Sequence, residues 1–534
     1  MEIKLINIVR DLYWDDRESL DMEILAASLI FYRHNVNLIN YKYSEIFDNS
    51  ETIIKDIAKE ANAIFVNFDF STDEDTMNLI YEIVDSIKKH EENIAIFMVG
   101  ERACLNYSDI LRDCPSIDYV MLCEAEKAGR EITEILKDRH NINNCLDFAF
   151  REVGEIKKAP QRQDFVTSYP WALRDKDILE SLQVAKVRTA RGCLGRCNFC
   201  VDIGYEKSWR GREINDIVDE IEYITNTYNI KQFNFLDNNL ADPGIEGKTR
   251  LISLMDKINE RQLKIYFNCL ARADSFCLEE DNLLINKMGR NGLFNILIGF
   301  ESGYQEDLRL FNKKTKVSDN YKAYEMFEQH KVNVLPGFIM FHPYSCVEGL
   351  IANAEFLKNI NKSYWFLAYC SSLKAFAGVE FVKKLKEDNL LSKDYSFKTT
   401  LNYRFVDNNI QGLAETLKNA RLDSNTIKLA MGLEDAMNIL ARVNKNYVDW
   451  NKAEQFNNNI QDLSQEFGHY VHNYFMKSVE MVSLGWNETS YNELFNELES
   501  KAEKLNVTNI IKGFMKNNIA NKELKHILYA KTIF

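Results

Sequence analysis

One stretch decides the fold that we predict for this chain: Arg191-Gly192-Cys193-Leu194-Gly195-Arg196-Cys197-Asn198-Phe199-Cys200. Its cysteines are spaced C-x3-C-x2-C and directly follow a predicted strand over residues 184–189. On a compact loop, three thiolates at this spacing each reach a different iron of a [4Fe-4S] cluster, and the fourth iron has no protein ligand. The stretch therefore predicts a cluster bound by Cys193, Cys197 and Cys200, with one iron open to a cofactor or substrate.

Structural zinc is the main alternative for this triad. A closed zinc site needs four protein ligands, usually in two close pairs, and no fourth Cys or His lies near the triad in sequence. The other cysteines form no second close group. The cluster is the stronger interpretation, and an iron–sulfur electron carrier or a zinc-stabilised binding protein stays as the alternative of another class.

The residues around and after the triad alternate short apolar runs with helical patterns. Strands are expected at 184–189, 233–236, 265–269, 294–298, 332–340 and 365–369. Six βα units without a break predict a partial (β/α)6 barrel over residues 181–372, open on one side.

The regions that flank the barrel have different patterns. Residues 1–140 contain five further βα units, which predicts an N-terminal doubly wound, Rossmann-like α/β domain. Residues 141–180 lose this rhythm and contain Pro160 and Pro170, as expected of a linker. Residues 373–534 carry long amphipathic patterns that predict a helical C-terminal domain.

Composition limits the classes of function. The chain has 534 residues, 46% hydrophobic content and a net charge of −14, which indicates a multidomain acidic protein and disfavours binding to nucleic acid through its phosphates. We expect no signal peptide and no membrane-spanning segment. Eleven cysteines without secretion signals favour a reducing compartment, so we expect a cytoplasmic protein.

With Phe199 in the aromatic position, the triad resembles the C-x3-C-x-aromatic-C signature of the radical S-adenosylmethionine (SAM) superfamily. The resemblance implies that the open iron chelates the methionine part of SAM. One electron, from a donor such as flavodoxin or ferredoxin, would then split SAM to a 5′-deoxyadenosyl radical. That radical would abstract hydrogen from an unactivated C–H bond.

The same resemblance implies a cofactor contact for Phe199 in the cluster loop and SAM contacts at the carboxyl ends of the barrel strands. Asp237 stands where many relatives have a Gly-Gly-Glu motif that binds the methionine amino group. Arg272, in an Arg-x-Asp pattern, is either a partner of the SAM carboxylate or an ordinary surface arginine. In a Gly-x-Glu-Ser segment, Glu301 is expected at either the ribose hydroxyls or the amino group, and Ser302 at the ribose. Gly337 is expected near the adenine.

The N-terminal region resembles the cobalamin-binding domain that precedes many radical SAM barrels. Asp118-Tyr119-Val120 and Glu124-Ala125-Glu126 are similar to that domain's last strand and its end. Val99-Gly100-Glu101-Arg102-Ala103 differs, because relatives usually have a Gly-Gly pair there. A Glu and an Arg at this turn would obstruct the nucleotide tail of cobalamin, so the domain either binds cobalamin or keeps only the fold.

The subclass of reaction is open at this stage. We expect modification of a peptide or another natural-product substrate, either by cobalamin-dependent C-methylation or by a cobalamin-free reaction such as epimerisation. Cys370 ends the sixth predicted strand, and in radical SAM peptide epimerases a cysteine donates a hydrogen atom to the substrate radical. A small buried hydrophobe is the commoner role of such a cysteine.

Overall fold

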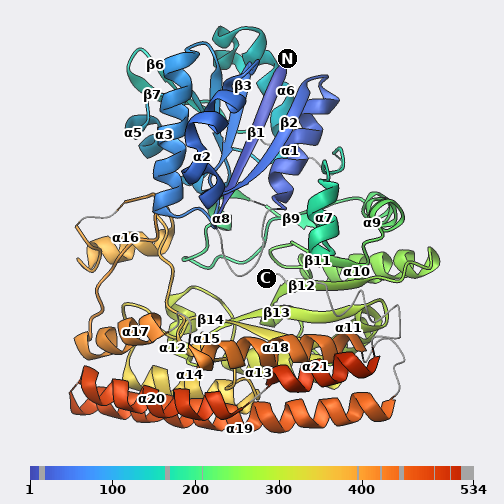
Figure 1. Cartoon of the computed structure of the whole chain (residues 1–534), viewed down its shortest axis with the longest axis vertical. Coiled ribbons are helices and arrows are strands. Elements are labelled where there is room, and N and C mark those ends of the chain that lie inside the picture. Colours follow the sequence, from blue (N-terminus) through green and yellow to red (C-terminus); the bar gives the residue numbers. More distant parts are fainter. Residues whose placement is uncertain are drawn as a thin grey trace.

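The computed structural model describes residues 1–10, 18–162, 169–206, 208–393, 396–420, 424–443, 450–485, 487–505 and 507–518. These residues form two large sheets, each covered by helices, and a helical C-terminal part (Figure 1). The N-terminal sheet occupies one end of the molecule, and the second sheet lies between it and the long C-terminal helices. The predicted α/β fold class is confirmed.

The N-terminal sheet has seven strands in the order β2-β1-β3-β4-β5-β6-β7. The strands are β1 (Glu2–Val9), β2 (Asn35–Lys42), β3 (Ala63–Asn67), β4 (Ala95–Val99), β5 (Tyr119–Met121), β6 (Phe148–Glu152) and β7 (Glu155–Lys158). The helices among them are α1 (Leu20–Phe31), α2 (Tyr43–Ala58), α3 (Glu74–His90), α4 (Glu101–Leu105), α5 (Tyr107–Asp113) and α6 (Ala125–Lys137). The first five strands are parallel, and their 2-1-3-4-5 order is doubly wound.

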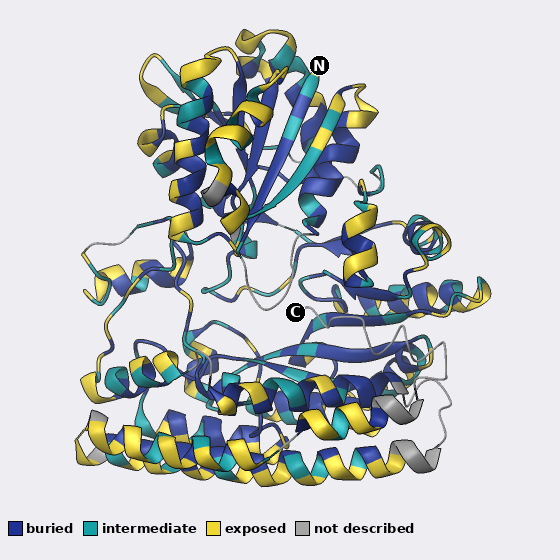
Figure 2. Cartoon of the chain, viewed as in Figure 1, coloured by how far each residue is buried: buried dark blue, intermediate teal, exposed yellow. Residues whose placement is uncertain are grey.

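The central strands of this sheet are buried along their whole length. Every residue of β3 and β4 is buried, because helices cover both faces of the sheet (Figure 2). Such strands are continuous apolar runs, which is why the sequence pattern located these two.

The expected linker over 141–180 differs from the structure in its first half. β6 pairs antiparallel with β5, and β7 pairs antiparallel with β6, so both strands extend the N-terminal sheet. Only the first three residues of β6 are buried, and so short a run shows no strand period. Helix α7 (Lys176–Leu182) then leads into the second sheet.

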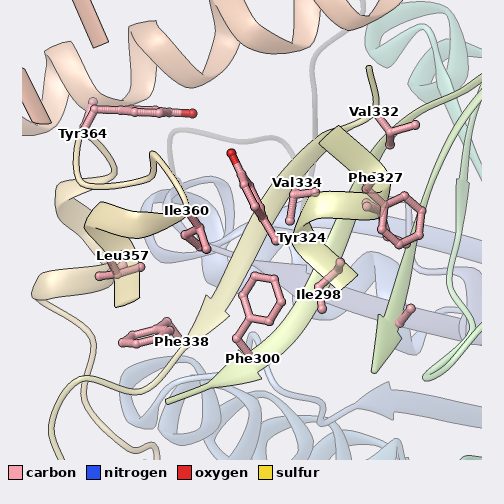
Figure 3. Close-up of a cluster of buried hydrophobic side chains, with 14 of the residues drawn as sticks. Ile298, Phe300, Tyr324, Phe327, Val332, Val334, Phe338, Leu357, Ile360 and Tyr364 are labelled. Atoms are coloured by element: carbon pink, nitrogen blue, oxygen red, sulfur yellow. The ribbon is translucent and has the colours of Figure 1, made fainter. Parts of the chain in front are cut away.

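The second sheet has five parallel strands in the order β14-β13-β12-β11-β8. The strands are β8 (Val184–Val187), β11 (Gln232–Phe235), β12 (Tyr266–Arg272), β13 (Leu293–Glu301) and β14 (Asn333–Phe338). The helices that alternate with them are α9 (Ile214–Tyr228), α10 (Gly244–Glu260), α11 (Asp281–Arg290), α13 (Val317–Gln329) and α14 (Val347–Asn359). Figure 3 shows one such contact, in which Ile298 and Val334 lie in a layer with Tyr324 and Phe327 of α13.

The predicted sixth strand over 365–369 is wrong. These residues form the short helix α15 (Phe366–Tyr369), and a single bridge between Phe341 and Ser372 continues the parallel sheet. A run of five apolar residues fits a buried strand and a buried helical turn equally well. The partial barrel therefore has five strands and one bridge.

The C-terminal helices pack directly on the barrel. They are α16 (Glu380–Glu387), α17 (Asn408–Ala420), α18 (Asn425–Val443), α19 (Trp450–Leu484), α20 (Glu488–Lys504) and α21 (Val507–Asn518). One continuous hydrophobic core joins helices α17–α21 to the barrel strands, and a second core joins the N-terminal domain to residues 373–401, which include α16. The predicted helical part is present but has no core of its own. Among the described helices, none is long and apolar enough to cross a membrane.

Candidate active site

The cysteine loop follows β8 and is fixed by a glycine that no other residue can replace. Gly192 has a φ of +82°, and a Cβ at this position would lie 2.2 Å from the carbonyl oxygen of Ser208. Only glycine adopts this conformation without strain or a clash. Farther along the loop, the N–H of Leu194 donates a hydrogen bond of 2.7 Å to Asp242.

Asp237 has a different role from the predicted contact with the methionine amino group. Its Oδ1 accepts hydrogen bonds from the N–H groups of Thr189 and Ala190 at 2.7 and 3.0 Å. Its Oδ2 accepts from the Thr189 hydroxyl, and the residue is only 2% exposed. With both oxygens used, Asp237 clamps the end of β8 just before the cysteine loop and does not face a ligand.

The three thiols lie in surroundings that suit thiolates bound to iron. Cys197 is buried, whereas Cys193 and Cys200 are half-buried. The N–H of Gly195 donates to Cys193 Sγ at 3.2 Å, and Arg272 Nη1 donates to Cys197 Sγ at 3.4 Å. Burial raises the pKa of Cys193 to about 12, so a thiolate there needs a cation at its sulfur.

The donor set fits a [4Fe-4S] cluster better than a single ion. In the part of the chain that the structure describes, no three His, Cys, Asp or Glu side chains converge on one metal ion. A cubane needs no such convergence, because each thiolate binds a different iron. Gly195 also keeps the loop close to its partners, since a Cβ there would lie 2.7 Å from Arg272 Nη1.

Phe199 anchors the loop to the end of helix α12 (Gln305–Leu310). Its ring meets the ring of Phe311 edge-to-face at 5.4 Å. The neighbouring Asn198 donates hydrogen bonds to the carbonyl oxygens of Leu310 and Phe311 at 2.8 and 3.1 Å. The aromatic position of the motif therefore holds the loop in place, and the cofactor contact predicted for Phe199 stays a prediction.

Arg272 ends β12 beside the cysteine loop, as predicted, and is not a surface residue. Its guanidinium forms a fork with both oxygens of Asp274, at 3.0 and 2.8 Å. It also donates to the carbonyl oxygen of Lys313 at 2.7 Å. Burial disfavours the charge, but Asp274 raises the pKa of Arg272 above its usual value. Arg272 is thus a fixed cation next to Cys197.

A buried ion pair stands beside Arg272. Glu301 ends β13 with a φ of +64°, where the register between β13 and β14 shifts. Lys313 Nζ donates to Glu301 Oε1 at 2.9 Å, and the lysine side chain is 4% exposed. The motif predicted Glu301 but not Lys313, because a lysine pair in a loop gives no local sign of burial.

Ser302 differs from the predicted ribose contact. It is 0% exposed, and its hydroxyl lies 2.8 Å from both Asp307 Oδ2 and Asn353 Oδ1. It accepts a further hydrogen bond from the N–H of Tyr304 at 3.0 Å. Ser302 therefore belongs to the buried turn after β13.

Gly337 pairs with Gly299 of β13, and a Cβ at Gly337 would lie 3.2 Å from the Gly299 Cα. This pair keeps part of the sheet free of side chains close to Glu301. The adenine contact of Gly337 stays a prediction.

Cys370 does not end a strand. It caps the C-terminus of α15, is 3% exposed, and belongs to the core shared with the C-terminal helices. Its thiol acts electrostatically on Tyr491 of α20. The hydrogen-donor hypothesis loses its geometric basis, and Cys370 has the commoner role of a small buried residue.

A buried charge network that the sequence did not predict joins the cysteine loop to the N-terminal domain. Arg191 donates to both oxygens of Glu126, at 2.8 and 2.9 Å, and to Asp21 at 2.6 Å. It also donates to Glu206 at 2.8 Å, and Glu206 accepts from the Gly192 N–H at 2.6 Å. Burial disfavours the charge of Arg191, but these carboxylates hold its pKa well above the usual value.

The turn that departs from the cobalamin-domain pattern separates its two charges. Arg102 is turned away from the junction and is 2% exposed. It donates to the carbonyl oxygen of Phe397 at 2.9 Å and stacks on the ring of Phe68. Glu101 stays at the junction, where burial and the charges of Asp21, Asp69 and Asp202 raise its pKa well above the usual value.

Solved structures similar to this chain share its whole architecture. The cobalamin-dependent S-adenosylmethionine radical enzyme OxsB, solved with aqua-cobalamin and S-adenosylmethionine bound, superposes with a TM-score of 0.70 at 18% identity. The superposition covers 99% of this chain and 82% of that one. This chain has the fold of that radical SAM enzyme.

A second enzyme with this fold covers less of the chain. The radical SAM methyltransferase TsrM from Kitasatospora setae, solved with cobalamin and a [4Fe-4S] cluster bound, gives a TM-score of 0.60 at 12% identity. That superposition covers 72% of this chain and 75% of TsrM.

The relatives found by sequence are distant. A Pyrococcus horikoshii protein named as an uncharacterized methyltransferase is 23% identical over 63% of this chain and 72% of its own length. The anaerobic magnesium-protoporphyrin IX monomethyl ester cyclase of Synechocystis is 24% identical over 58% of this chain and 61% of its own length. The 4′-phospho-dehydrooxetanocin synthase of Priestia megaterium is 26% identical over 52% of this chain and 41% of its own length. No family model matches the chain.

Proposed function

We propose that this protein is a cobalamin-dependent radical SAM enzyme that modifies an unactivated C–H bond, with C-methylation as the favoured outcome. One observation carries the proposal. The three thiols of the triad lie at the carboxyl edge of the barrel, where Arg272 donates to Cys197 Sγ and stands beside the Glu301–Lys313 pair. The similarity to OxsB along nearly the whole chain supports it.

The side chains of this site would meet both the negative charge of the cluster thiolates and the positive charge of the SAM amino group. Cys193, Cys197 and Cys200 would hold the cluster, and Arg272 would offset the negative charge of the thiolates. Lys313 fixes one oxygen of Glu301, which leaves Oε2 to accept a hydrogen bond from the amino group of SAM or from its ribose. Arg272 keeps Asp274 in place, so the charges at the site are set before SAM binds.

The N-terminal domain is compatible with cobalamin at its carboxyl edge. Of the two side chains expected to obstruct the nucleotide tail, Arg102 is turned away into its contact with Phe397, and Glu101 alone stays at the junction. When bound, the cluster supplies the electron that splits SAM, and cobalamin can carry a methyl group. The residues of the chain would then orient the two cofactors and exclude water.

The substrate and the electron donor are also proposals. A peptide or a small molecule would enter at the barrel, and a flavodoxin or ferredoxin would supply the electron. The epimerase alternative finds no support, because Cys370 lies in the helical core. We therefore favour methylation over a cobalamin-free hydrogen exchange.

Anaerobic reconstitution with iron and sulfide tests the proposal. We expect about four irons per chain, visible absorption of an iron–sulfur cluster, and 5′-deoxyadenosine after reduction with dithionite in the presence of SAM. Purification in the presence of hydroxocobalamin should leave its visible spectrum with the protein. A cluster without 5′-deoxyadenosine would favour an electron carrier, and bound zinc without a cluster would favour the binding protein.

A further inference from the structure

Four asparagines form a row across the interior face of the barrel. In the register of the sheet, Asn234 of β11 pairs with Asn268, Asn268 with Asn295, and Asn295 with Asn333 of β14. Asn234, Asn268 and Asn295 are at most 2% exposed, and the amide of Asn268 donates to Asn234 at 2.7 Å. Burying a side-chain amide costs free energy unless the amide has hydrogen-bond partners.

Helix α18 packs across the barrel next to this row. Its Asn438 accepts from the amides of Asn295 and Asn333, the latter at 2.9 Å. Arg442, one turn further on, donates to Gln232 of β11 at 2.9 Å. Asn333 and Gln232 are the first residues of their strands, so the helix crosses from β14 to β11 at the amino ends of the strands.

Between the asparagine row and the cysteine loop, the interior face is open to a ligand. The next residues inward are Leu270, Leu297 and Leu335, which pair in one row and are only half-buried. On the opposite face of the same strands, Ile298 and Val334 are at most 1% exposed. Because the outer face is fully packed and the inner face is not, the accessible surface lies inside the barrel.

Asp435 of α18 faces this interior. It lies seven residues before Arg442, which places the two on nearly the same side of the helix, about 20° apart. Right-handed βα connections set the order of the strands in the sheet, and α18, itself a right-handed helix, runs from β14 to β11. With both hands fixed, the side of α18 that carries Asp435 faces the carboxyl ends of the strands. Gly432, a further step around the helix, already packs against Val507 of α21.

The Asp435 carboxylate has no hydrogen bond or ion pair within the described residues, and it is exposed. Arg442, the cation that acts on it, is engaged with Gln232. Burial by the surrounding protein, followed by the charge of Glu434, raises the pKa of Asp435 to about 6. Asp435 is therefore a solvent-accessible carboxylate with protein on several sides.

Two asparagines of the row also keep unused hydrogen-bonding capacity. Asn268 Oδ1 and Asn295 Oδ1 are buried without a partner, and these residues are 1% and 0% exposed. Both belong to the row that borders the interior next to α18. These buried acceptors are closed off by the surrounding side chains, so the open part of the interior lies beyond them, at the leucine row.

We propose that the barrel interior binds a substrate with a primary ammonium group, which pairs with Asp435 while an apolar stem lies along Leu297 and Leu335. The inference deepens the proposed function and rests on it. From the leucine row to Glu301 is about 13 Å along β13, at roughly 3.3 Å per residue. A substrate of that length would present its far end to the SAM site.

Calorimetric titration of the anaerobically reconstituted full chain tests the inference. The probes are hexylamine, hexanol and hexanoate, which differ only in the terminal group. We expect hexylamine to bind about tenfold more tightly than the other two, as for a hydrogen-bonded charge pair. Equal binding of all three would overturn the proposal. A blocked tripeptide with a central lysine separates the two sources of an ammonium group: tighter binding than hexylamine assigns a peptide, weaker binding a small molecule.

Three variants make the test specific. Asp435→Asn should reduce the preference for the amine to within about twofold, whereas Asp435→Glu, which keeps the charge, should retain it. Asp462→Asn is the matched control, because Asp462 is an exposed residue of α19 and should bind like the wild type. A preference that survives in Asp435→Asn would overturn the proposal. Absence of 5′-deoxyadenosine from the wild type would instead overturn the proposed function alone.

Discussion

The two ends of the barrel use polar side chains in different ways. At the carboxyl end, the charged groups of Arg191, Asp237 and Arg272 hold the cysteine loop. At the amino end, the neutral amides of Asn295 and Asn438 hold a helix against the strands. Charges at the carboxyl end stand where cofactor and electron would meet, whereas at the amino end amides close the barrel beside the charged groups of Glu434 and Arg442. We therefore expect that each end can be changed without changing the other.

The largest expected effect is at the carboxyl end and leaves the fold intact. Cys197→Ser should abolish cluster absorption and 5′-deoxyadenosine formation, because a serine hydroxyl is a poor ligand for cluster iron. Far-ultraviolet circular dichroism should stay unchanged. Cys346→Ser is the control, since Cys346 only caps α14 by accepting from the N–H of Gly349, which a hydroxyl also does. Wild-type activity in Cys197→Ser would remove this cysteine from the cluster.

The next effect separates the charge network from the cluster. Arg191→Met leaves Glu126, Asp21 and Glu206 without their shared cation, and breaking a buried network of this kind costs about 3–5 kcal/mol. The midpoint of urea unfolding should fall accordingly. Arg196→Met, at an exposed position of the same loop, should leave the midpoint unchanged. If both variants unfold at the wild-type midpoint, the network contributes nothing to holding the domains together.

A smaller effect is expected at the amino end. Asn438→Leu removes the acceptor for the buried amide of Asn295, which costs about 1–3 kcal/mol. Urea unfolding should report this loss while the cluster spectrum of the reconstituted protein stays the same. Asn459→Leu, at an exposed position of α19, is the matched control. A changed cluster spectrum in Asn438→Leu would mean that the two ends of the barrel are coupled.

The sequence predicts the carboxyl end better than the amino end for a physical reason. The triad and the glycine before it act within a few residues of each other, and Arg272 and Glu301 stand in short motifs at strand ends. Lys313 and the partners of Arg191 depend on contacts between segments far apart in the chain, so no local pattern marks them.

The asparagine row and α15 show two further limits. The four asparagines come from separate strands, and only the register of the sheet brings them together. The residues of α15 lie in an apolar run whose length suits a strand as well as a helix. In the same way, Asp237 and Ser302 were given ligand contacts from motifs, although their hydrogen bonds are used within the protein.

The smallest effect is on the pH dependence of stability. It concerns Asp435, which lies on α18 at the amino end of the barrel and faces the carboxyl end. Burial raises the pKa of Asp435 to about 6, so the folded state binds its proton more tightly than the unfolded state does. The charged form therefore opposes folding above about pH 6, and this cost disappears as the pH falls toward the unfolded value. Asp435→Asn should be slightly more stable than the wild type at pH 7.5, and the difference should shrink by pH 5. Urea midpoints at the two pH values measure it, and a difference that does not vary with pH would mean that Asp435 is as well solvated as a surface carboxylate.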